Sequence, residues 1–583
     1  MFCTLSDATC LGVVPVFVNA GAALLPAILA GVASVAALIF NPRALVRLCK
    51  AKPHIPLLIV MVAVGGYFAV TWVLGQPDQA AQSPAAGRRA PASENDNDWA
   101  QVALEILRQE ERAKVREFLR AAAKPDGKTP PTDTVTNNGP NASQDPTEPP
   151  ATPDPPDETP RAAIFRGDAS RCGYLGGGSP LELTQLWPFA EPDTMYLSSP
   201  IVVGDAVYGA SCLLDPPTNY GAIFCLDADT GEERWYTDVV DDPATGEEIE
   251  FKGFFSSPAI SADGKYLVIG QGLHSESNCQ LVCLEADTGK LKWLVQTPLH
   301  IEGSPAIEGD VVIAGVGAIE VGDDHKPAGD PAGAGHPGYV LAVRLSDGKE
   351  LWQHQVNDPE SSPVVDRGIA YIGSGINGSK VVALRIETDE ELKQKGLERV
   401  AWEVDTPYPA TGTVTLAGDL VLIGCGKGDY VFAAPDPAGV VLALDRATGE
   451  IRWQQHLDDA VLGPIAAAGG KAICPVRNGE VIALDLGAAE GDRVLWRQKI
   501  SEDTPVLAGP AFTGDYVYAV SQDGYLAVLD AADGSVLQRL YINAEDKPGE
   551  MGLSVSSPIV SGGRVYVGSE TGGLQCLVGK VLK

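Results

Sequence analysis

Short apolar runs separated by glycine-containing turns recur from about residue 183 to the end of the chain. The clearest copy is Val441–Trp453, VLALDRATGEIRW, which predicts a strand, a turn at Arg446–Gly449 and a second strand that ends on Trp453. Glycine supplies the positive φ of such a turn, while Asp and Thr bond to its backbone. Similar units end at Trp235, Trp293 and Trp352. A period of roughly 40–50 residues, with four short strands in each copy, predicts a β-propeller.

Each copy opens on an apolar strand that is usually led by proline, as in SSPIVV and SSPAIS. Eight such openings are present, starting at Ser198, Ser256, Gly303, Ser361, Thr411, Gly463, Gly509 and Ser556. The last copy ends after LQCLVG without a fourth strand, whereas Leu183–Phe189 (LTQLWPF) has no strands before it. Pairing these two segments closes the ring and removes two exposed edges. We therefore predict an all-β, eight-bladed propeller over residues 166–583, with Leu183–Phe189 as the outer strand of its last blade.

The first seventy-five residues have a different pattern. Leu11–Phe40 and Leu57–Gly75 carry no charged residue, and each is long enough to cross a bilayer as a helix. The loop between them contains Arg43, Arg47, Lys50 and Lys52, so the positive-inside rule places it in the cytoplasm. A cleaved signal peptide is the alternative, but the first ten residues lack Lys and Arg. Residues 1–75 thus predict a two-helix anchor in the cytoplasmic (inner) membrane, with the propeller on the periplasmic or extracytoplasmic side.

A connector joins the predicted anchor to the repeats. Residues 76–97 form a small-residue linker, and residues 98–124 favour an amphipathic helix with Asp98 as its N-cap. This helix could associate with a second copy, lie at the membrane interface or rest on its own protein. Residues 125–165 are rich in proline and polar residues, so we expect them to form a disordered spacer.

Charge narrows the choice of partner. The chain has 43 Lys and Arg against 76 Asp and Glu, a formal net charge of −33. This excess of acidic residues argues against nucleic acid, or an anionic membrane surface, as a partner of the propeller. It is compatible with a cationic or neutral partner, and also with a simple role in solubility.

The pattern A-x-D-x-x-x-G-x-x-x-W, complete at Ala443, Asp445, Gly449 and Trp453, resembles the tryptophan-docking repeat of quinoprotein-type (PQQ-like repeat) eight-bladed propellers. That family includes pyrroloquinoline-quinone alcohol dehydrogenases and a cofactor-free, barrel-assembly (BamB-like) branch. The resemblance implies that each tryptophan docks on the neighbouring blade, here Trp187, Trp235, Trp293, Trp352, Trp402, Trp453 and Trp496. The copy ending near Gln538 lacks the tryptophan, and those before Trp402 and Trp496 have insertions after the third strand.

The same resemblance gives two functional branches. A quinone dehydrogenase is expected to have an adjacent Cys-Cys pair, a carboxylate–Asn calcium site and a catalytic Asp. The sequence contains no Cys-Cys pair and no C-x-x-C-H haem site. We therefore expect no cofactor and no enzymatic activity, and favour a scaffold that binds proteins through its loop-rich rim. The alternatives are a quinone- or metal-dependent oxidoreductase, with PQQ and calcium as cofactors, and a sensor or carrier of a small ligand.

Two sets of side chains are candidates for further chemistry. Cys212 and Cys279 follow the second strands of adjacent blades, so a disulfide between them would suit an extracytoplasmic domain. The long loop of the third copy contains Asp323, Asp324, His325 and His336, with Asp330 between them and His274 one blade earlier, and these could supply a mixed nitrogen and oxygen metal site. A solvated insertion rich in Gly and Pro explains the same residues.

Overall fold

The computed structural model describes residues 163–582, with gaps at 216–217, 244, 274–275, 318–337, 376–377, 431–432, 489–492, 546–548 and 550. The predicted anchor, linker and amphipathic helix lie outside these residues, as does almost all of the proline-rich spacer. Within the described part, no helix is long and apolar enough to cross a membrane.

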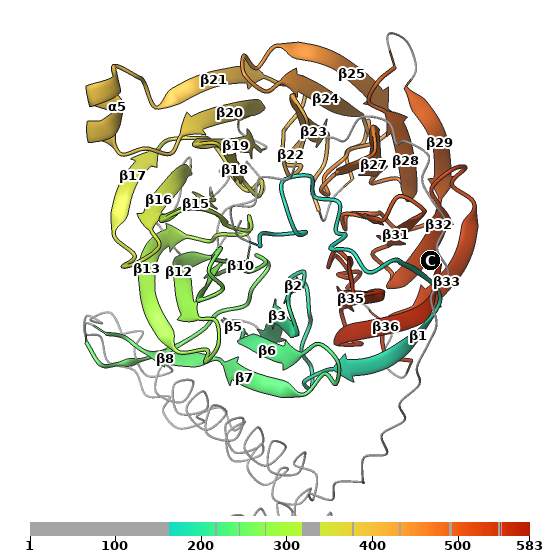
Figure 1. The fold of residues 1–583 in the computed structure, drawn as a ribbon, viewed down its shortest axis with the longest axis horizontal. Coiled ribbons are helices and arrows are strands. Elements are labelled where there is room, and N and C mark those ends of the chain that lie inside the picture. The colour runs from blue at the N-terminus through green and yellow to red at the C-terminus, as the bar shows by residue number, and fades with distance from the viewer. Residues whose placement is uncertain are drawn as a thin grey trace, which may run out of the picture. The chain divides into compact units, whose positions relative to one another are not determined.

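Eight four-stranded antiparallel sheets surround a central axis like the blades of a propeller (Figure 1). In each sheet the first strand lies next to the axis and the fourth lies on the outside. The first four blades are β2 (Ile201–Val203), β3 (Ala206–Ala210), β6 (Ile223–Asp227) and β7 (Glu233–Thr237); β10 (Ala259–Ile260), β11 (Tyr266–Gly270), β12 (Ser277–Glu285) and β13 (Leu291–Leu299); β14 (Ala306–Glu308), β15 (Val311–Val316), β16 (Tyr339–Arg344) and β17 (Glu350–His354); and β18 (Val364–Asp366), β19 (Ile369–Ser374), β20 (Lys380–Arg385) and β21 (Val400–Asp405).

The remaining blades follow the same order. They are β22 (Thr415–Ala417), β23 (Leu420–Gly426), β24 (Gly439–Asp445) and β25 (Ile451–Leu457); β26 (Ala466–Ala468), β27 (Lys471–Pro475), β28 (Glu480–Asp485) and β29 (Val494–Lys499); β30 (Ala511–Phe512), β31 (Tyr516–Val520), β32 (Tyr525–Asp530) and β33 (Val536–Tyr541); and β34 (Ile559–Ser561), β35 (Arg564–Gly568) and β36 (Leu574–Leu582), completed by β1 (Ser179–Phe189). Two hairpins are added to the first blade: β4 (Leu213–Asp215) with β5 (Thr218–Tyr220), and β8 (Val239–Asp241) with β9 (Glu248–Glu250).

The ring closes between the two ends of the repeat array. β1 pairs with β36, with Trp187 opposite Cys576 and Phe189 opposite Leu574. The prediction of an all-β, eight-bladed propeller closed by this segment is confirmed, although β1 begins at Ser179, four residues before the segment seen in the sequence. Closure leaves the blades with no unpaired end sheet to invite edge-to-edge association.

Burial explains why the second and third strands are apolar throughout. All five residues of β3 and all seven of β24 are buried, because both faces of these strands pack against neighbouring blades. The outer strand β25 is instead mostly exposed or half-buried, as expected for a strand with one face in solvent. The core therefore lies between adjacent blades.

The insertion of the fourth blade contains α5 (Asp389–Lys395), the helix described within the propeller unit. Thr388 caps its first turn, and Glu391 reaches back to the amide of Thr388 to complete a capping box. Gly396 ends the helix with a φ of 67°. This short helix lies on the outside of the ring (Figure 1).

Tryptophan side chains link successive blades. In six of these links the indole Nε1 donates to the carbonyl of the residue that follows the third strand of the next blade: Trp187 to Ala228, Trp235 to Ala286, Trp293 to Leu345, Trp352 to Ile386, Trp402 to Arg446 and Trp496 to Ala531. A Cβ added at Gly289 would lie 2.5 Å from the Trp235 ring, so the turn glycine makes room for the indole as well as supplying a φ of 68°.

The two blades with insertions use arginine in place of this glycine. The guanidinium of Arg399 lies 4.1 Å from the centre of the Trp352 ring, and that of Arg493 lies 4.5 Å from the Trp453 ring. Arg493 Nη1 donates to the carbonyls of Asp485 and Leu486, each at 3.2 Å. Leu486 is the residue whose counterparts accept the tryptophan hydrogen bond, and Trp453 Nε1 is buried without a partner. Arg493 thus donates to the carbonyl that the tryptophan would otherwise bond to.

The seventh blade, whose outer strand lacks a tryptophan, is joined in another way. Gln538 donates to the carbonyl of Leu183 and accepts from its amide, at 2.9 and 2.7 Å. The next blade there is closed by β1 and has no turn between its third and fourth strands, so an indole would find no turn to dock on. The side-chain amide bonds to the backbone of β1 instead.

Candidate functional site: the central channel

A segment that carries no repeat pattern, Ala163–Leu175, crosses the centre of the ring (Figure 1). Ala163 bridges to Ile260 of β10, and Leu175 donates to the carbonyl of Val560 in β34. Between them, carbonyls of this crossing segment accept hydrogen bonds from the amides of Leu416, Ala467, Phe512 and Val560. The carbonyl of Ala163 also accepts from the amide of Ile260, so the crossing segment satisfies inner-strand amides from five blades.

Two arginines of the crossing segment are buried at 1% exposure. Arg166 donates to the carbonyls of Arg171, Gly509 and Pro510, while Arg171 donates to those of Phe165 and Pro363. Burial lowers the pKa of each guanidinium to about 9. Backbone carbonyls thus hold both cations, and they tie the segment to blades on opposite sides of the channel.

The serines of the S-S-P openings form a belt around the channel. Each blade's amide donates to the hydroxyl of the next: Gly509 to Ser557, Ser557 to Ser199, Ser199 to Ser257, Ser257 to Ser304 and Ser304 to Ser362, at 2.8–3.0 Å. The belt ends where the following opening has Thr413 in place of serine. The motif therefore connects blade to blade, in addition to starting each inner strand.

The serines of this belt line a cavity of about 60 Å³ in the central channel. One ring of its lining is contributed by the residue three positions before the opening proline or its counterpart. Of the seven such residues that line the cavity, four are apolar (Leu197, Phe255, Leu507 and Val555) and three, from consecutive blades, are polar (Glu302, Glu360 and Thr411). Phe165 of the crossing segment also lines the cavity. One side of the channel is therefore polar at a position where the fold itself accepts apolar residues.

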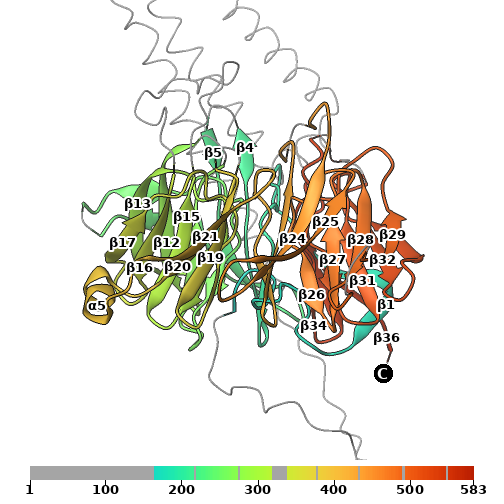
Figure 2. The same cartoon turned by 90° about the horizontal axis from the view of Figure 1, so that it is seen from above.

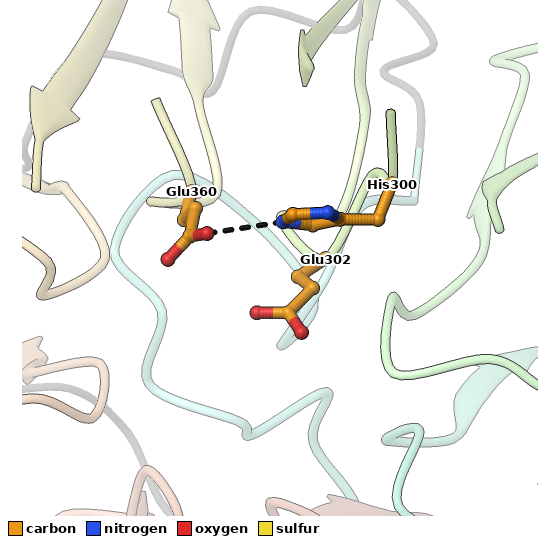
Figure 3. Close-up of side chains that lie close together, drawn as sticks. All are labelled: His300, Glu302 and Glu360. Carbon is orange, nitrogen blue, oxygen red and sulfur yellow. Dashed lines mark hydrogen bonds and ion pairs between the residues drawn. The ribbon is translucent and has the colours of Figure 1, made fainter. Parts of the chain in front are cut away.

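His300, Glu302 and Glu360 come together on this polar side (Figure 3). His300 and Glu302 lie on the loop between β13 and β14, and Glu360 lies on the loop between β17 and β18. His300 Nε2 is 3.1 Å from Glu360 Oε1, and one ligand atom from each of the three residues lies within 4.8 Å of the others. His300 is fully buried, and the two glutamates are half-buried.

The position of His300 is fixed by its backbone and by a glycine. Its amide donates to the carbonyl of Glu276, and its carbonyl accepts from the amide of Gly317. A Cβ at Gly317 would lie 2.3 Å from His300 Nε2, so only glycine leaves room for the imidazole. The ring is thereby held toward the two carboxylates.

Tyr430 adds a further polar group to the cavity. Its hydroxyl donates to the carbonyl of Leu462 at 2.9 Å, and its ring packs edge-on against Phe255. Burial raises the pKa of Tyr430 well above its usual range, and the nearby carboxylates Glu302 and Glu360 raise it further. Tyr430 therefore stays protonated and faces the negative side of the channel.

The structure describes some of the candidate residues found in the sequence and not others. Asp323, Asp324, His325, Asp330 and His336 lie outside the described residues, as does His274, so the predicted metal site in that loop stays a prediction. Cys212 and Cys279 are buried free thiols in the structure, not the expected disulfide. Each sulfur is turned to a different glycine: a Cβ at Gly253 would lie 2.5 Å from Cys212 Sγ, and one at Gly272 would lie 2.4 Å from Cys279 Sγ.

The cavity lining also bears on the quinone alternative. The described residues that line it offer one ring of hydroxyls, two carboxylates and a tyrosine, without an asparagine or a cysteine pair. This lining does not match the carboxylate–Asn calcium site and Cys-Cys pair expected of a quinone dehydrogenase.

The polar cluster was missed in the sequence, although a signal for it is present. Glu302-Gly-Ser-Pro and Glu360-Ser-Ser-Pro place a carboxylate at the same position of consecutive openings, where other copies have Leu197, Phe255 and Val555. Aligning the openings one residue further toward the N-terminus would have revealed the change from apolar to acidic.

The eight blades and their tryptophan-docking turns define the class of the protein as a PQQ-like repeat propeller. A family model described as outer membrane protein assembly factor BamB matches residues 184–425 and 399–579, and the chain belongs to this family.

The individual relatives include both assembly factors and quinone dehydrogenases. Outer membrane protein assembly factor BamB of Shewanella oneidensis is 23% identical over 409 residues, covering 67% of this chain and 90% of the relative. The dehydrogenase subunit of the quinone alcohol dehydrogenase of Gluconobacter oxydans is 25% identical over 281 residues, which is 44% of this chain but 31% of that subunit. The crystal structure of BamB from Moraxella catarrhalis aligns over 69% of this chain and 99% of that one, with 16% identity and a TM-score of 0.48.

Proposed function

We propose that this propeller is a non-enzymatic scaffold that binds protein partners during outer membrane protein assembly. The observation that carries the proposal is the match of the assembly-factor family across the repeats, from residue 184 to residue 579. The assembly factor of Shewanella oneidensis is matched over 90% of its length, whereas the dehydrogenase subunit is matched over 31%. The lining of the channel supports the same choice, since it lacks the ligand set of a quinone enzyme.

The proposed binding face carries the loops between the second and third strands. The hairpin β4–β5 belongs to this set and projects beyond the blades (Figure 2). It is braced against the next blade, because Asn219 Nδ2 donates to Glu276 Oε1 at 2.7 Å. Extended loops on a rigid scaffold commonly carry binding function, and this one is held in place before a partner arrives.

We further propose that residues 1–75 hold the propeller at the inner membrane, on its extracytoplasmic side. The support is the pair of uncharged segments and the basic loop between them. Residues 98–165 would then set the distance between membrane and propeller. A protease added to intact spheroplasts should cleave within residues 125–160 and release the propeller; protection until the membrane is broken would overturn this orientation.

Site-specific photocrosslinking tests whether the face that carries the hairpin β4–β5 binds a partner. A photoreactive residue at Leu213, on the hairpin, should crosslink to a component of the outer membrane assembly machinery in living cells. The matched control is Arg367, whose side chain is 84% exposed on a turn between first and second strands, at the opposite end of the blades. Equal crosslinking from both positions, or none from the hairpin, would contradict the proposed face.

A further inference from the structure

We infer that His300, Glu302 and Glu360 form a binding site for one divalent transition-metal ion, such as zinc, at the polar side of the central channel. Imidazole nitrogen combined with carboxylate oxygen is a ligand set that zinc and related ions accept, whereas calcium and magnesium prefer oxygen alone. The inference is independent of the scaffold function proposed above.

The geometry fits such an ion with small adjustments. Zinc binds nitrogen and oxygen at about 2.0–2.2 Å, so ligand atoms around a tetrahedral ion lie roughly 3.3 Å apart. His300 Nε2 and Glu360 Oε1 are already 3.1 Å apart, and the three ligand atoms lie within 4.8 Å of one another. A shift of the Glu302 carboxylate toward the pair would complete the site.

The cluster differs from an acidic surface patch in its position in the repeat. Glu302 and Glu360 occupy equivalent positions in the third and fourth blades, where Leu197 and Leu507 stand in other blades. Confining carboxylates in a partly buried channel costs free energy unless a cation compensates them. Folding alone does not require them, since leucine is accepted at the same position.

A second feature of the cavity points to a ligand. Thr411 holds the equivalent position in the fifth blade, is 7% exposed and lines the same cavity. Among the described residues, its hydroxyl is one of the buried polar atoms without a hydrogen-bond partner. A buried hydroxyl left without a partner destabilises the fold. A water or anion on the open coordination position of the metal would give Thr411 a partner.

Three protein ligands leave one coordination position of a tetrahedral ion open. That position would face the cavity, where the serine belt and Tyr430 supply polar groups. The site therefore resembles zinc sites that keep one position for water or a ligand more closely than closed structural sites. It would also link the loops of two adjacent blades through one ion.

The test is zinc binding by the full-length, untagged chain, measured by titration calorimetry and by metal content after dialysis. We expect one zinc per chain in the wild type and about 100-fold weaker binding in Glu302→Gln and Glu360→Gln. Glu302→Leu should fold, because leucine occupies this position in other blades, and should lose the site. Glu403→Gln, on an exposed outer strand, is the control and should bind as the wild type does.

Cobalt provides a readout that depends on the ligands. One equivalent of Co²⁺ should give visible d–d absorption bands that disappear in Glu360→Gln and are displaced by Zn²⁺ but not by millimolar Ca²⁺. The variant His325→Ala/His336→Ala removes both imidazoles of the other candidate loop and should keep these bands. Wild-type zinc affinity in both glutamine variants, or loss of the cobalt bands in the His325/His336 variant alone, would overturn the inference.

Discussion

The blades of this propeller are joined in two ways around a tryptophan, and the two ways respond differently to substitution. In the joint between the first and second blades, Trp235 donates to Ala286, and Gly289 leaves room for the indole. In the joint between the fifth and sixth blades, Arg493 stacks on Trp453 and takes the equivalent carbonyl of Leu486. The first joint depends on the absence of a side chain, and the second on the presence of a large one.

The difference follows from the insertions. A tight turn after the third strand packs directly against the indole of the preceding blade, and glycine allows this close approach. Where residues are inserted after β20 or β28, the turn no longer covers the indole, and Arg399 or Arg493 covers it instead. The same docking position thus occurs in two forms. Both use a carbonyl that follows the third strand as the acceptor, but their sequences differ.

The largest effect on stability is expected at the joint between the first and second blades, which contains Gly289. Gly289→Ala forces alanine to a φ of 68° and places its Cβ 2.5 Å from the Trp235 ring, which should lower the free energy of unfolding by about 3 kcal/mol. Gly309→Ala is the matched control, since Gly309 has a φ of 60° and no atom within 4 Å of the added Cβ; it should cost about 1 kcal/mol. Equal losses in urea unfolding would show that the indole contact is unimportant.

The joint between the fifth and sixth blades, which contains Arg493, should be the next most sensitive to substitution. Arg493→Met removes the contact with the Trp453 ring and leaves the carbonyls of Asp485 and Leu486 without this donor, at a cost of about 2 kcal/mol. Arg497→Met, which breaks a more exposed ion pair with Asp458, should cost less than about 1 kcal/mol. A similar loss in both variants, measured by denaturant unfolding, would mean that Arg493 acts only as a surface charge.

A pair of tryptophan substitutions separates the hydrogen bond from the packing. Trp235→Phe removes a donor from Ala286, whereas Trp453→Phe removes an Nε1 that has no partner. Both lose part of the ring, so the free energies of unfolding should differ by about 1 kcal/mol, with Trp235→Phe the less stable. If Trp453→Phe proved equally or more destabilising, the indole hydrogen bond would not distinguish the joints.

The sequence predicted the fold well because the repeats signal it many times over. The turn motif, the proline-led openings and the incomplete copies at each end sufficed to predict eight blades and their closure by β1. The family resemblance also pointed to the tryptophans. The helix α5 was not predicted, although Thr388 and Glu391 have the spacing of a capping box.

The arrangement of residues in the channel could be predicted from the sequence to a much smaller extent. The crossing segment Ala163–Leu175 follows no repeat, and Arg166 and Arg171 bond to carbonyls of residues that are distant in sequence. His300 and Glu360 lie in different blades, so only the closed ring brings them within 3.1 Å. Local pattern determines each blade, whereas the contents of the channel depend on how eight blades meet.

The smallest expected effect concerns Asp445, which begins the turn that follows β24 in the fifth blade. Asp445 accepts hydrogen bonds from the amides of Ala447 and Thr448 and pairs with Arg452; chiefly the bond to Arg452 lowers its pKa to about 2. Because the folded pKa lies below the unfolded value of about 3.9, this stabilisation is present above pH 4 and is lost as the pH falls from about 4 to 2. The melting temperature of Asp445→Asn should therefore lie below that of the wild type at pH 6, and the difference should shrink as the pH falls toward 2. In Arg452→Gln the pKa of Asp445 rises, so its stabilisation should disappear at a higher pH; an Asp445→Asn difference that stays constant from pH 6 to pH 2.5 would show that the charge of Asp445 does not stabilise the turn.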